Sequence, residues 1–128
     1  MRRPLATILL LGTLVALGAC SAPATTGVRT ITAADAVAQL DERTVIDVRT
    51  PAETATGMVA GAMNVDLSAP DFRDRIAALD RGGSYLLYCR TGNRSAQAAQ
   101  IMRELGFTDV VDAGGFEGLV AAGAPTGP

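Results

Sequence analysis

A cysteine beside a short polar loop is the residue of this chain best suited to covalent chemistry. Cys89 ends an aromatic and aliphatic run that begins at Ser84, and the segment after it contains glycine and two arginines. Such a run is typical of a buried parallel strand. Residues 95–105 then carry apolar side chains at helical spacing. Cys89 is therefore predicted at the carboxyl end of a strand, facing the amino end of a helix.

This position favours the thiolate form of Cys89, which is the nucleophilic form of cysteine. Open α/β sheets carry their sites at the carboxyl ends of the strands. A loop that curls around the sulfur directs backbone N–H groups inward, and the start of the helix adds partial positive charge. Arg90 and Arg94 add full charges nearby. The alternative, that Cys89 is a small apolar residue capping the strand, agrees poorly with the polar, glycine-containing segment that follows.

Four segments, in the same order along the chain, resemble the motifs of single-domain rhodanese-like sulfurtransferases. They are Val45–Pro51 with Glu53, Gly61–Val65, the loop Cys89–Ser95, and Gly114–Glu117 with Ala121–Pro125. The resemblance covers about Arg29 to Pro125. It implies an α/β, three-layer rhodanese-like fold, with a mostly parallel five-stranded sheet and helices on both faces. It also implies catalysis by Cys89 through a persulfide, with no cofactor and no metal.

The resemblance assigns the remaining loop residues to substrate binding. These residues are Arg90, Thr91, Gly92, Asn93, Arg94 and Ser95. Arg90 is the expected contact for an anionic donor, since its side chain should point to solvent. Arg94, at the start of the helix, either binds substrate or has a structural role.

Three charged residues outside the loop are expected to support it. They are Asp47, Arg49 and Glu53. Glu53 lies four residues after Arg49, close enough in sequence for the two to form an ion pair. The alternative is an exposed pair that contributes only about 0–1 kcal/mol.

The length of the loop distinguishes sulfur transfer from dephosphorylation. Four residues separate Cys89 from Arg94. Cysteine phosphatases, including relatives with the rhodanese fold, have a loop that is one residue longer and wraps a phosphate. The shorter loop favours a single sulfur atom on the cysteine.

The predicted function is transfer of a sulfane sulfur from thiosulfate or a persulfide, through Cys89, to cyanide, a thiol or a protein thiol. A first alternative is a membrane-tethered module that binds sulfur or a partner without catalysis, although such modules commonly lack the cysteine. Phosphatase and thiol oxidoreductase activities are further alternatives. The oxidoreductase is disfavoured because the domain has no second thiol.

The first residues resemble the signal peptide of a bacterial lipoprotein. Two arginines precede an apolar run that is shorter than the about 20 residues of a membrane span. The run ends in a lipobox-like segment, so residues 1–19 are predicted to be removed and Cys20 to be lipidated. Residues 20–27 would form the tether and residues 28–126 the domain. The protein would then be exported and anchored to the outer face of the cell membrane, or on its periplasmic side. An ordinary cleaved signal peptide and an uncleaved anchor are the alternatives.

The composition excludes several classes of site. The formal net charge is −2 and the chain has no lysine, so nucleic-acid binding is not expected. It has no histidine, so a Cys–His dyad is impossible and cysteine activation must come from arginine and backbone dipoles. With Cys20 lipidated, a single free cysteine remains, which argues against a structural zinc site.

Strands and helices alternate along the domain, which predicts parallel strands joined by right-handed crossovers. The predicted strands are 28–31, 44–48, 63–65, 84–89 and 108–111. The predicted helices are 33–40, a short helix beginning at Pro51, 68–79, 95–105 and 116–122.

Overall fold

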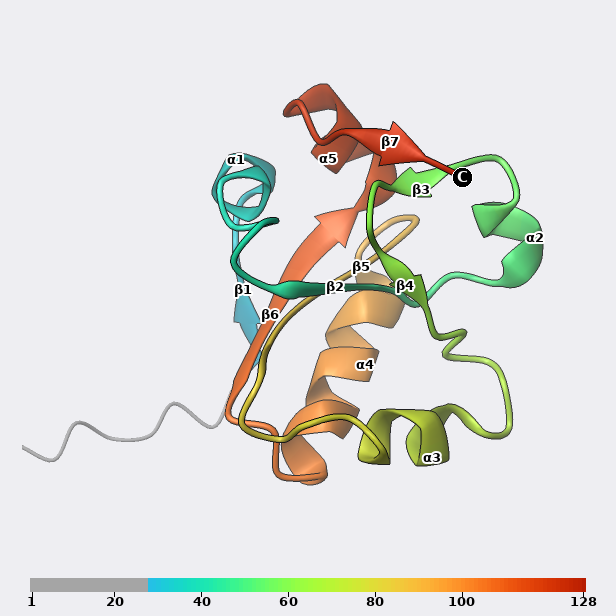
Figure 1. Ribbon diagram of the computed structural model, residues 1–128, viewed down its shortest axis with the longest axis vertical. Coiled ribbons are helices and arrows are strands. Elements are labelled where there is room, and N and C mark those ends of the chain that lie inside the picture. The colour runs from blue at the N-terminus through green and yellow to red at the C-terminus, as the bar shows by residue number, and fades with distance from the viewer. Residues whose placement is uncertain (1–27) are drawn as a thin grey trace, which may run out of the picture.

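The computed structural model describes residues 28–128 (Figure 1). Its strands are β1 (Arg29–Thr30), β2 (Thr44–Asp47), β3 (Met58–Val59), β4 (Met63–Asn64), β5 (Ser84–Cys89), β6 (Asp109–Gly115) and β7 (Thr126–Gly127). Its helices are α1 (Ala33–Val37), α2 (Pro51–Thr54), α3 (Phe72–Ala77), α4 (Asn93–Glu104) and α5 (Phe116–Ala121). The predicted signal peptide, the Cys20 lipidation site and the tether lie outside the described residues. No helix within residues 28–128 is long and apolar enough to cross a membrane.

Five strands form one parallel sheet in the order β1–β6–β5–β2–β4. The two longest strands, β5 and β6, are paired inside the sheet, with β2 on the other side of β5. Because all five strands run in the same direction, the carboxyl ends of β2, β5 and β6 lie along one edge. The structure thus confirms the predicted α/β fold, with its five-stranded parallel sheet and helices.

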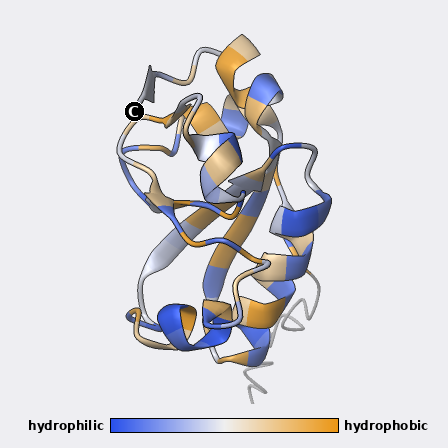
Figure 2. Ribbon diagram, turned by 90° about the vertical axis from the view of Figure 1, so that its right-hand side faces the viewer, coloured by the Kyte–Doolittle hydropathy of each residue, from blue (hydrophilic) through white to orange (hydrophobic). Residues whose placement is uncertain are grey.

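The sheet separates two hydrophobic clusters, each covered by its own helices. Side chains of α3 and α4 pack on one face, and side chains of α1 and α5 pack on the other. Along β5, Leu87 and Cys89 face the α4 side whereas Leu86 and Tyr88 face the α5 side, as strand geometry requires. Hydrophobic and hydrophilic segments alternate along the helices (Figure 2). Burial on both faces explains why residues 85–89 of β5 are aliphatic, aromatic or cysteine.

The elements around Cys89 extend further than predicted. Helix α4 begins at Asn93, two residues earlier than expected, and β6 continues from Val111 to Gly115. This extension of β6 contains Asp112 and two glycines, which are poor strand formers. Pairing with β5 therefore overrides the local preference, and it places β6 beside the loop that follows Cys89. Helix α3 is shorter than expected, since it begins at Phe72 instead of Ser68.

A second, antiparallel sheet of two short strands was not predicted. β3 pairs with β7 near the C-terminus, and Figure 1 shows the two strands side by side. Each strand has only two residues, so neither has a recognisable pattern in the sequence. This pairing holds the end of the chain against the segment that follows α2.

Candidate active site

The loop that follows Cys89 is shaped by two glycines. Cys89 is the last residue of β5, and three residues connect it to α4. Gly92 has a φ of 102°, a conformation that favours glycine. Gly115 of β6 contacts the loop backbone, since a Cβ added there would lie 2.6 Å from the Arg90 carbonyl oxygen. The loop can therefore curl tightly around the sulfur and stay close to β6.

The Cys89 sulfur lies among hydrogen-bond donors. The Gly92 N–H donates to Sγ at 2.9 Å, and the Ser95 hydroxyl oxygen is 3.5 Å from the same atom. Burial raises the pKa of the Cys89 thiol. Hydrogen bonds from the loop and from the first turn of α4, among them those of the Ser95, Gly92 and Thr91 N–H groups, lower it more, so the pKa lies below its ordinary value. The loop thus favours the thiolate, as predicted.

Cys89 itself is closed off from solvent, whereas the outer loop residues are open to it. Cys89 has an exposed fraction of 0%. Arg90, Thr91 and Asn93 are exposed. Arg90 therefore faces solvent as predicted, and it is the loop cation available to an approaching anion. A substrate can reach the sulfur only when the loop shifts.

A buried carboxylate, Asp112, also belongs to the site and was not predicted. The Ser95 hydroxyl lies 2.6 Å from Asp112 Oδ1, which also accepts the Gly114 N–H at 3.0 Å. Ser95 and Asp112 are both buried. The one signal in the sequence was a charged residue between the apolar Val111 and Ala113, which strand propensity does not explain. Its role depends on the contact between β6 and α4, which the sequence pattern did not reveal.

Arg94 holds the loop to α2 through Glu53. The two side chains form a bidentate ion pair, with Arg94 Nη1 2.7 Å from Glu53 Oε2 and Arg94 Nη2 2.6 Å from Glu53 Oε1. Hydrogen bonds from Arg94, with further ones from Thr50, lower the pKa of Glu53 to about 2. Thr50 and Glu53 also form a capping box at the start of α2, which fixes the direction of the carboxylate. Of the two roles considered for Arg94, this contact supports the structural one.

The expected ion pair between Arg49 and Glu53 is wrong. Arg49 pairs instead with Asp47, at 2.6 Å between Nη2 and Oδ2, and both residues are buried. Residues two apart on extended chain project to the same side, so Asp47 lies beside Arg49 while Glu53 turns toward α4. Arg49 also donates to the Gly57 carbonyl at 2.8 Å. This pair supports the segment between β2 and β3 instead of contacting the sulfur.

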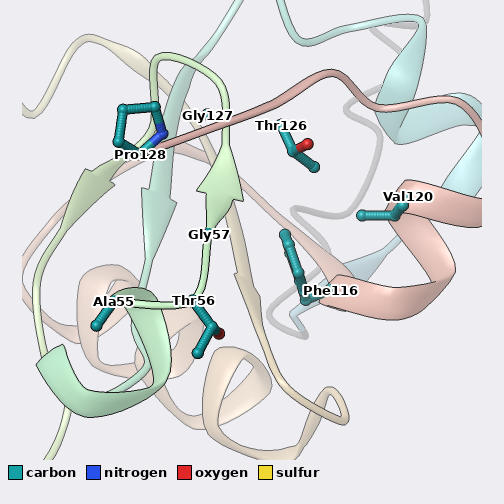
Figure 3. Close-up of a pocket in the computed structure, with 8 residues that line it drawn as sticks. All are labelled: Ala55, Thr56, Gly57, Phe116, Val120, Thr126, Gly127 and Pro128. Atoms are coloured by element: carbon teal, nitrogen blue, oxygen red, sulfur yellow. The ribbon is translucent and has the colours of Figure 1, made fainter.

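A cavity of about 430 Å³ lies beside α5 (Figure 3). The lining residues are Ala55, Thr56, Gly57, Phe116, Val120, Thr126, Gly127 and Pro128. The Phe116 ring forms part of the wall, and its centroid lies 4.3 Å from the Arg49 guanidinium carbon. No residue of the Cys89–Ser95 loop lines this cavity. It is therefore distinct from the space around the sulfur.

Comparisons with known proteins agree with this architecture. The chain is 36% identical over 74 residues to the thiosulfate sulfurtransferase PspE of Escherichia coli, covering 58% of this chain and 71% of that protein. It is 39% identical over 75 residues to the thiosulfate sulfurtransferase GlpE of Pseudomonas aeruginosa, covering 57% and 66%.

Solved structures give the same result. The crystal structure of a rhodanese-related protein from Thermoplasma volcanium superposes with a TM-score of 0.69 at 34% identity, over 77% of this chain and 97% of that one. A structure described as rhodanese with anions, from Escherichia coli, gives a TM-score of 0.57 at 33% identity, over 66% and 96%. The sequence model of the rhodanese-like domain matches residues 32–122, and the chain therefore belongs to the family of rhodanese-like domains.

Proposed function

We propose that this protein is a sulfurtransferase that carries a sulfane sulfur as a persulfide on Cys89. The donor is thiosulfate or another persulfide, and the acceptor is cyanide, a thiol or a protein thiol. The observation that carries the proposal is the Cys89 sulfur at the centre of a tight loop, with the Gly92 N–H 2.9 Å away. The thiosulfate sulfurtransferase names of two relatives support the choice of donor.

The reaction has two balanced steps. The Cys89 thiolate attacks the outer sulfur of thiosulfate, and the bond between the two donor sulfurs breaks with its electron pair leaving on sulfite. The persulfide on Cys89 is negatively charged, and the backbone N–H groups of the loop stabilise it. Cyanide or a thiolate then attacks the terminal sulfur, and the electron pair of the broken bond returns to Cys89.

The charges of the loop suit an anionic donor. Arg90 is exposed and is close in sequence to the nucleophile, so it can contact the oxygens of thiosulfate. Arg94 is bound to Glu53, so we assign it to holding the loop, with Asp47 and Arg49 as support further away. The small cradle accommodates one additional sulfur once the exposed part of the loop shifts.

Intact-mass measurement before and after treatment with thiosulfate tests the proposal. The full chain should gain the mass of one sulfur atom and lose it on addition of cyanide, with thiocyanate as product. Cys89→Ser should gain nothing at this site. If wild-type protein with reduced Cys89 gains no sulfur from thiosulfate or from glutathione persulfide, the proposal is wrong, and phosphate esters and non-catalytic sulfur binding become the next candidates.

We also propose that the protein is an exported lipoprotein with lipid on Cys20. The sequence features that support this are the two N-terminal arginines, the short apolar run and the cysteine after Leu17-Gly18-Ala19. Metabolic labelling with a palmitate analogue in a bacterial host should label the protein and place it in the membrane fraction. Cys20→Ala should abolish the label, whereas a labelled Cys20→Ala protein would contradict the assignment.

A further inference from the structure

The Ser95 hydroxyl has one proton and lies within reach of two competing anions. Its oxygen is 2.6 Å from Asp112 Oδ1 and 3.5 Å from Cys89 Sγ. The carbonyl oxygens of Gly92 and Gly114 lie at 3.0 and 3.5 Å. Hydrogen bonds from a hydroxyl to a carboxylate are 2.5–2.7 Å long and are among the strong ones. Asp112 Oδ1 is therefore the nearest and strongest acceptor for this single proton.

The position of Asp112 as the acceptor for the Ser95 hydroxyl is fixed by its surroundings. Its Oδ1 accepts the Gly114 N–H at 3.0 Å, and the residue is only 3% exposed. Strand β6 fixes its backbone, and Ser95 is fixed in the first turn of α4. The three groups Cys89, Ser95 and Asp112 thus form a buried row across three elements, namely β5, α4 and β6.

We propose that Asp112 is a positioning residue that keeps the Ser95 hydroxyl proton away from the Cys89 sulfur. Backbone N–H groups then remain as the donors to the thiolate. A thiolate loses nucleophilicity as its pKa falls, so withholding one strong donor preserves its power to attack. This consequence for sulfur transfer rests on the proposed function, whereas the direction of the proton does not.

The other charged groups around the sulfur are already engaged or lie outside the row. Arg94 on α4 is paired with Glu53 of α2, and Asp47 of β2 is neutralised by Arg49. Arg90 of the loop is exposed to solvent. A change at Asp112 can therefore act on Cys89 through its charge or through Ser95, and the two effects need separate variants.

Two substitutions at Asp112 separate those effects. Asp112→Asn removes the charge but leaves an oxygen that can accept from Gly114 and Ser95. Asp112→Ala removes the charge and the acceptor, which frees the Ser95 proton for the sulfur. We expect the Cys89 pKa to be about one unit lower in the alanine variant than in the asparagine variant, the shift given by one hydrogen bond to a charged group. In a Ser95→Ala background this difference should disappear.

The pKa is measured by ultraviolet absorbance of the thiolate against pH, in the full chain, with the curve of Cys89→Ser subtracted to remove Cys20 and the tyrosines. Asp109→Ala, at the opposite end of β6, is the matched control and should leave the Cys89 pKa unchanged. Equal pKa values in the two Asp112 variants would overturn the proposal. So would a difference that persists without Ser95.

Ser95→Ala alone decides the question if Asp112→Ala does not fold. Under the proposal, the hydroxyl does not donate to the sulfur, so this variant should not raise the Cys89 pKa. A rise of about one unit would mean that Ser95 had stabilised the thiolate directly, and would overturn the proposal. The readout needs no turnover, so failure of sulfur transfer in wild-type protein would leave it intact.

Discussion

The two ends of the parallel sheet each carry an ion pair, and the two pairs differ in how deeply they are buried. At the carboxyl end, Arg49 and Asp47 form a pair whose side chains are 4% and 0% exposed. At the amino end, Arg43 and Asp109 are joined at 2.8 Å with side chains 11% and 44% exposed, and Ser84 also donates to the carboxylate. Water can replace a lost partner at the amino end but not at the carboxyl end. The difference shows that the end next to Cys89 is fixed by buried polar contacts.

Loss of Arg49 should lower the free energy of unfolding more than any other change considered below. Arg49→Ala leaves Asp47 charged and buried, which should lower the free energy of unfolding by about 3–5 kcal/mol. Unfolding in urea, followed by circular dichroism, measures this value. Replacing both partners, as Asp47→Leu with Arg49→Met, should recover most of the loss. If the double variant is no more stable than Arg49→Ala, the cost does not come from the unpaired carboxylate.

The second-largest loss of stability is expected when a methyl group is added beside the loop that follows Cys89. Gly115→Ala places a Cβ 2.6 Å from the Arg90 carbonyl oxygen, so the loop must move, at about 1–3 kcal/mol. The rate of sulfur transfer should fall with the stability. Gly118→Ala is the control, because a Cβ there meets nothing within 4 Å and alanine favours a helix by about 0.8–1.0 kcal/mol over glycine. Equal stability of the two variants would show that the contact is loose.

Protonation of Glu53 at low pH should reduce the stability of the carboxyl end of the sheet. Because its pKa is lowered to about 2 in the folded protein from 4.5, its stabilising effect is complete above about pH 4.5 and is lost as the pH falls through 2. Glu53→Gln should therefore be less stable than wild type at neutral pH, by about 1 kcal/mol for a partly exposed pair. Urea unfolding at several pH values should show the two proteins converging in acid. A constant difference down to pH 2 would contradict the ion pair with Arg94.

The smallest loss of stability is expected from breaking the ion pair at the amino end of the sheet. Arg43→Gln should cost only about 0.2–1 kcal/mol, since its pair with Asp109 is partly open to water. High salt should reduce the difference further, which the Arg49 variants should not show. A loss as large as that of Arg49→Ala would remove the contrast between the two ends.

The central part of the site could be predicted because it depends on local pattern. The apolar strand, the glycine in the loop and the helical spacing after it are contiguous in the sequence, and each has a physical signature. They placed Cys89 correctly at the carboxyl end of β5, facing α4.

The partners of the site could not be predicted, because each comes from a distant segment. Arg94 meets Glu53 across 41 residues, and Ser95 meets Asp112 across 17. Only the packing of α2 and β6 against α4 selects these pairs. Nearness in sequence favoured the wrong partner for Glu53, since Arg49 is turned into the core beside Asp47. The pairing of β3 with β7 was missed for the same reason.

The closed position of Cys89 has a consequence for how long its sulfur stays reduced. Thiols with a lowered pKa are readily oxidised through sulfenic to sulfinic and sulfonic acids, and the last two are not ordinarily reversed. Each step adds an oxygen atom that needs room beside the sulfur. There is little such room, because the Gly92 nitrogen lies 2.9 Å from the Cys89 sulfur and Cys89 is 0% exposed. Under the proposed function, a movement of the loop that admits substrate would therefore also expose the reduced sulfur to irreversible oxidation.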